Sequence, residues 1–175
     1  MGWKLKGLDP KKHATLELGG LAVLIVIVIA LPVGATPVDV VSDESAAWTL
    51  DADAQTISRI EPEGGRPLTK SPTVAPTGIA LGGRFLWVAF VRIEREETRV
   101  GIAALDPSTL VLQDQKLLPR VGPRRYFEPP QVAWAGNAVW LSGPRDILRR
   151  IDPNSLTVTD TLRLPDAPVD LVVGL

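Results

Sequence analysis

Short apolar runs separated by turn-forming clusters recur along the chain from about residue 39 to its end. In the middle of this region the runs are residues 78–81, 86–91, 99–105 and 111–118. Gly82-Gly83, a charged stretch and Asp106-Pro107-Ser108 separate them. Runs of this length between Gly, Pro and Asp clusters are typical of strands joined by hairpins. The pattern therefore predicts an all-β region built from units of four short antiparallel strands.

The four-strand unit repeats along the chain. Trp87 and its neighbours match Trp140 and its neighbours, and Trp48 lies in a weaker first copy. The period is close to 38–39 residues once two insertions are removed. We assign units to residues 39–75, 76–129 and 130–167, with a fourth beginning at 168. Four antiparallel strands repeated at this period are the signature of β-propeller blades, with the tryptophans Trp48, Trp87, Trp134 and Trp140 in the core rather than on ligand surfaces.

The number of units predicts an incomplete, partial β-propeller. About three four-stranded antiparallel blades are present, whereas a ring needs at least about four. Open blade faces would expose apolar side chains and favour aggregation. We therefore expect the remaining propeller blades to come from the same longer chain or from another chain.

An uncharged segment, residues 18–38, precedes the repeats, and its centre at residues 21–31 is apolar throughout. About 20 residues in a helix cross the ~30 Å core of a bilayer. Four lysines lie before the segment and three acidic residues follow it closely. The positive-inside rule then predicts one transmembrane helix in a bacterial cell membrane, with residues 1–17 in the cytoplasm and the propeller outside. The alternative is a signal peptide cleaved near Ala35, which would release a secreted propeller.

Composition excludes several kinds of chemistry. Lys and Arg total 19 against 20 Asp and Glu, which gives a net charge of −1 and no basic surface for nucleic acid. Cysteine is absent, and His13 is the only histidine. A disulfide framework, a thiolate metal site and histidine-based catalysis in the repeats are therefore excluded. We expect no catalytic residues, no metal and no cofactor.

The repeat motifs resemble a known group of proteins. The pattern P-x-G-I-A-x-G-G-x-x-L-W-V-A begins at Pro76, and I-D-P-x-S-L begins at Ile151. Together they resemble the bacterial propeller repeats of the virginiamycin B lyase-like, YVTN and NHL type, over about residues 37–175. The resemblance implies a propeller whose relatives include lyases, sensor domains and binding proteins. In the lyase a histidine takes part in catalysis, and no histidine follows His13, so the lyase activity is not implied here.

Two insertions in the middle unit predict a binding face. Residues 92–98 lengthen the connection between the second and third strands, and residues 119–129 lengthen the exit to the next unit. Because strands alternate in direction, both connections lie at the same end of the blade, where loops on a rigid scaffold often carry binding residues. Arg and Tyr are common in interfaces. The candidate binding residues are Arg95, Arg120, Arg124, Arg125, Tyr126 and Phe127.

Two interpretations of this face remain open. It recognises a protein or an anionic partner, or residues 92–99 form a solvated charged hairpin while Tyr126 and Phe127 only hold their loop against the blade. The predicted function is a membrane-anchored extracytoplasmic binding or sensing module, within a fragment of a longer protein. The alternative is a propeller lyase or hydrolase whose catalytic residues lie in blades outside this chain.

Overall fold

The computed structural model describes residues 36–72, 74–94, 97–120, 129–143, 146–166, 168 and 171. Residues 18–35 of the predicted transmembrane helix lie outside these ranges. No helix in the described ranges is long and apolar enough to cross a membrane. Pro37 and Val38, which end the uncharged segment, belong to the first strand instead, because Pro37 pairs with Asp51 of the second strand.

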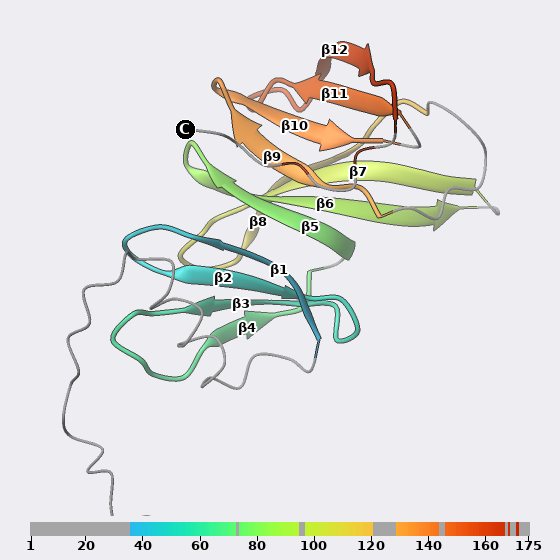
Figure 1. The fold of residues 1–175 in the computed structure, drawn as a ribbon. Coiled ribbons are helices and arrows are strands. Elements are labelled where there is room, and N and C mark those ends of the chain that lie inside the picture. The colour runs from blue at the N-terminus through green and yellow to red at the C-terminus, as the bar shows by residue number, and fades with distance from the viewer. Residues whose placement is uncertain are drawn as a thin grey trace, which may run out of the picture. The chain divides into compact units, whose positions relative to one another are not determined.

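Within the described residues, three four-stranded antiparallel sheets follow one another along the chain, as the repeats predict (Figure 1). The first sheet contains β1 (Pro37–Ser42), β2 (Ala47–Asp51), β3 (Thr56–Ile60) and β4 (Leu68–Lys70). The second contains β5 (Ala75–Gly82), β6 (Phe85–Glu94), β7 (Glu97–Leu105) and β8 (Leu112–Leu117). The third contains β9 (Val132–Ala135), β10 (Ala138–Ser142), β11 (Ile147–Ile151) and β12 (Val158–Arg163). The prediction of about three four-stranded antiparallel units is confirmed.

Each sheet runs from an inner first strand to an outer fourth strand. β1 contacts β5, and β5 contacts β9, so the first strands of the three sheets are neighbours. They line an open cavity of about 520 Å³, to which Leu171 of the predicted fourth unit also contributes. In contrast, β4, β8 and β12 are almost entirely exposed. This inside-to-outside order is the order of strands in a propeller blade.

The core consists of two apolar seams between neighbouring sheets. In the first seam, Trp48 and Leu50 pack with Leu86, Val88 and Phe90. The second seam joins the opposite face of the second sheet to the third sheet, and includes Trp87, Ala89, Ile102, Val139, Leu141 and Ile151. Successive side chains of a strand point to opposite faces, so β6 supplies alternate residues to the two seams.

The tryptophans that repeat along the chain have different surroundings. Trp48 and Trp87 are fully buried, at 1% and 0% exposure, as predicted. Trp134 stacks on Trp87 across the second seam, with ring centroids 6.0 Å apart and planes 6° apart, but is only partly buried. Trp140 is also only partly buried, because it points away from the second seam. The expectation of four core tryptophans is therefore too simple for Trp134 and Trp140.

Aspartates close the turns that follow β7 and β11. The Asp106 carboxylate accepts hydrogen bonds from the backbone N–H of Ser108 and from both the N–H and hydroxyl of Thr109. Asp152 accepts the equivalent bonds from Asn154 and Ser155. Hydrogen bonds from Thr109 hold the pKa of Asp106 below its usual value, and those from Ser155 do the same to the pKa of Asp152. Both Asp-Pro pairs thus act as turn formers, as predicted.

The described residues of the first insertion, 92–94 and 97–98, extend strands rather than lengthening a loop. The β6–β7 ladder continues as far as the pair Glu94 and Glu97. Continued pairing gives the added backbone groups hydrogen-bond partners. At the described end of β6, Ile93 is 75% exposed, and Arg92 and Glu94 form an ion pair of 3.7 Å at the surface. The expectation of a longer loop is therefore corrected to a longer hairpin.

Candidate functional site

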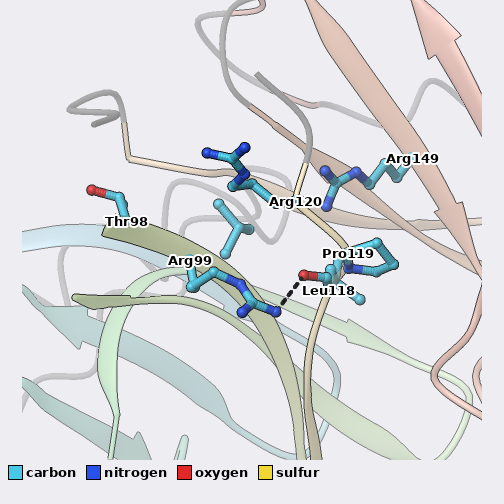
Figure 2. A pocket seen from close by; sticks show the side chains of 7 residues that line it. Thr98, Arg99, Leu118, Pro119, Arg120 and Arg149 are labelled. Atoms are coloured by element: carbon cyan, nitrogen blue, oxygen red, sulfur yellow. Dashed lines mark hydrogen bonds between the residues drawn. The ribbon is translucent and has the colours of Figure 1, made fainter. Parts of the chain in front are cut away.

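The second and third sheets meet in a small pocket at one end of their seam (Figure 2). Its lining comes from the start of β7, from the exit of β8 and from β11. The lining residues are Thr98, Arg99, Val100, Leu118, Pro119, Arg120 and Arg149. We call it the arginine pocket. The base of the long hairpin and the exit from β8 thus lie together, at the end where strand alternation places both insertions.

Backbone contacts fix the β8 exit against β7. The Leu118 N–H donates to the Val100 carbonyl at 2.9 Å, and the Leu118 side chain is buried. Nη2 of Arg99 donates to the Leu118 carbonyl at 3.2 Å, which ties the second strand of the hairpin to the same residue. Arg120 follows two residues later and is exposed at the surface. The position of Arg120 is therefore set by a short, anchored piece of chain.

Arg149 is the most unusual residue of the arginine pocket. It lies on β11 between Ile147 and Ile151, on the face that packs toward the second sheet, and is only 2% exposed. In the described part of the chain, no ion pair includes Arg149, and its buried Nη1 has no hydrogen-bond partner. Burial lowers the pKa of its guanidinium from the usual value. An arginine keeps its proton in such surroundings, so a nearly uncompensated positive charge lies in the seam.

All charged side chains in the described lining of the arginine pocket are positive. Three of its described lining residues are arginines and none is acidic. On the nearby hairpin, Glu94 is already paired with Arg92. Cationic clefts with low-dielectric walls concentrate anions, and guanidinium groups bind carboxylates and phosphates through charged hydrogen bonds. The arrangement suits recognition of an anionic group.

The described residues contain no cluster of His, Cys, Asp or Glu suited to a metal ion. The turn aspartates Asp106 and Asp152 are occupied in capping their turns. The described lining of the arginine pocket is therefore cationic and contains no His, Cys, Asp or Glu.

Of the six candidate residues, the structure describes Arg120 and places it in the arginine pocket. Arg95, Arg124, Arg125, Tyr126 and Phe127 lie outside the described ranges, and their part in binding stays a prediction. Sequence reasoning missed Arg149. A signal was present, because Ile147, Arg149 and Ile151 alternate along one strand and place the arginine on the apolar face.

Comparisons with known proteins identify the fold. No family model matches the sequence, and no curated protein matches it either. Solved structures do match: BamB from Moraxella catarrhalis (12% identity, TM-score 0.52), the WD40 domain of Pan2 from Neurospora crassa (8%, 0.52) and AztD from Citrobacter koseri (10%, 0.53). Each match covers 71% of this chain and 34%, 35% and 34% of the respective structure. The chain thus spans about a third of the length of these structures, and its fold is of the β-propeller type.

Proposed function

We propose that this chain supplies blades to a β-propeller that binds a protein partner through the end of the sheets bearing the arginine pocket. The observation that carries the proposal is the gathering of Arg99, Arg120 and Arg149 where two blade connections meet. Connections at one end of a rigid β scaffold commonly hold binding residues. The bacterial repeat motifs support a binding or sensing module of that type. Further blades, from a longer chain or another chain, then cover the outer face of the third sheet.

The test is a loop variant in which serine replaces Arg124, Arg125, Tyr126 and Phe127. We expect recovery of the partner to fall at least about tenfold, because large aromatic and arginine side chains contribute most of the energy of an interface. The measurement is capture from an envelope extract on the immobilised full chain, quantified by mass spectrometry. The matched control replaces the exposed Arg84 and Asn154 with alanine, in the turns at the opposite end of the sheets. Equal recovery by the loop variant and wild type would overturn the proposal.

We also propose that the uncharged segment anchors the propeller in a bacterial membrane, with the N-terminus in the cytoplasm. The lysines before the segment and the first strand of the propeller, which begins at Pro37 within the last two residues of the segment, support this topology. We expect the full chain to stay with the membrane during alkaline carbonate extraction and to keep its N-terminal residues. A soluble product beginning near Thr36 would show that the segment is a cleaved signal peptide.

A further inference from the structure

We propose that the arginine pocket binds a carboxylate group, presented by an acidic side chain of the partner, and that Arg149 is the buried cation paired with it. This inference rests on the proposed function, which supplies the partner. It adds the chemical group that is recognised and the residue that recognises it.

The first step is the state of Arg149 without a ligand. Arginine is almost never fully buried unless it is paired, because removing an unpaired charge from water is costly. Arg149 is nevertheless 2% exposed, and its Nη1 has no partner. The equivalent positions of the first two sheets hold Ser58 and Ala103. A small side chain therefore suffices for packing at this place in a blade, and the guanidinium brings a donor that packing does not use.

The second step is the arrangement of the other two arginines. Arg99 is held by its bond to the Leu118 carbonyl, and its buried Nε also has no partner. Arg120 is exposed beside it. In Figure 2 the guanidinium of Arg149 is directed toward the side of the pocket where Arg120 lies. A ligand that enters from solution would therefore contact the exposed Arg120 first and the buried Arg149 afterwards. Such an arrangement attracts an anion from solution and then pairs it where screening is weak.

The third step selects the kind of anion. The cavity volume is about 10 Å³, which is about the space needed to hold the centre of one water-sized group. A ligand must therefore enter with a narrow end. A carboxylate is flat, so one of its oxygens can enter the cavity and accept a charged hydrogen bond from Nη1 of Arg149, while its other oxygen stays on the side of exposed Arg120. A tetrahedral phosphate is broader. The narrow cavity therefore favours a carboxylate.

The experiment is an NMR titration of the ¹⁵N-labelled full chain in an uncharged detergent, at constant ionic strength. The probes are acetyl-Gly-Glu-Gly-amide, its glutamine counterpart and inorganic phosphate. We expect saturable shifts of the Arg99, Leu118 and Arg149 amides with the glutamate peptide alone. The substitution Arg149→Met should weaken this binding about tenfold or more, since a charged hydrogen bond is lost. The matched control is Arg150→Met, which removes the same charge from the exposed face of β11 and should change affinity less than about twofold.

Three results would overturn the carboxylate assignment. In the first, the glutamine peptide binds as tightly as the glutamate peptide. In the second, phosphate binds more tightly than the glutamate peptide. In the third, Arg149→Met and Arg150→Met change the affinity for the glutamate peptide equally. If the loop variant still loses the partner in these cases, the proposed function stands and only the assignment of the pocket fails. If the glutamate peptide binds as expected but the loop variant keeps the partner, the pocket stands and the proposed partner face fails.

Discussion

Replacing Trp87 with alanine is expected to lower the free energy of unfolding by about 3–5 kcal/mol. The ring is fully buried in the second seam, stacks on Trp134 and meets the edge of Phe85 at 5.3 Å between centroids. Its Nε1 also donates to the Gly82 carbonyl at 3.1 Å. Truncation would leave a cavity between two sheets that touch each other mainly through such side chains. Urea unfolding followed by circular dichroism measures the loss.

Trp140 provides a matched control for Trp87. It holds the same place in the repeat, and its Nε1 makes the same kind of bond, to the Ala135 carbonyl at 3.2 Å. It differs in pointing to the outer face of the third sheet, where it is only partly buried. We therefore expect Trp140→Ala to cost about 1–2 kcal/mol in this chain, and to approach the cost at Trp87 once a further blade covers that face. Equal losses at the two positions in the isolated chain would contradict the assignment of the second seam.

Replacing Arg149 with methionine is expected to raise the free energy of unfolding by about 1–4 kcal/mol. Removing a buried charge ends its desolvation cost, and a methionine of similar length adapts to the apolar surroundings of Ile147 and Ile151. The same variant should bind the glutamate peptide more weakly, so stability and binding change in opposite directions. Thermal and urea unfolding, with and without the peptide, measure both effects. At the same concentration the peptide should stabilise wild type more than the variant, because the variant binds it more weakly.

Arg150→Met is again the control, because position 150 lies on the exposed side of the same strand. Its stability should stay within about 0.5 kcal/mol of wild type, as is usual for surface substitutions. A large loss of stability in Arg149→Met would mean that the guanidinium has partners that compensate its charge. The arginine pocket would then be a structural element of the seam rather than a binding site.

The strands could be predicted from the sequence where turn chemistry is local. Asp106 and Asp152 bond to residues two and three positions ahead, so the turn motif alone reveals where one strand ends and the next begins. The extension of β6 to Glu94 could not be predicted in the same way. The residues in this part of the hairpin are charged or polar apart from Ile93, which is 75% exposed, so the apolar alternation that marks a half-buried strand is missing. Pairing across the ladder, rather than burial, keeps those residues in strands.

The seams between sheets were harder to predict because they depend on residues far apart in sequence. Gly82 and Gly83 together indicate a turn, and Gly83 indeed has a positive φ of 61°. Gly82, however, lies in β5, and a Cβ there would come within 1.9 Å of the Trp134 ring. Position 82 is therefore a glycine because the Trp134 ring of the neighbouring sheet occupies the space that a side chain would fill. Strand alternation was enough to predict that Arg120 lies near the base of the hairpin. The burial of Arg149 could not be predicted in this way, because it depends on which face of β11 packs against the second sheet.

The packing of the second sheet against the third can be measured through the two stacked tryptophans. NOE spectroscopy of the full chain, with the indole protons assigned, reports whether the Trp87 and Trp134 rings are neighbours. Stacked rings with centroids 6.0 Å apart predict cross-peaks between the two indoles, and these cross-peaks should vanish in Trp87→Ala. Cross-peaks within each sheet but none between these indoles would contradict the assignment of neighbouring propeller blades, and with it the seam in which Arg149 is buried.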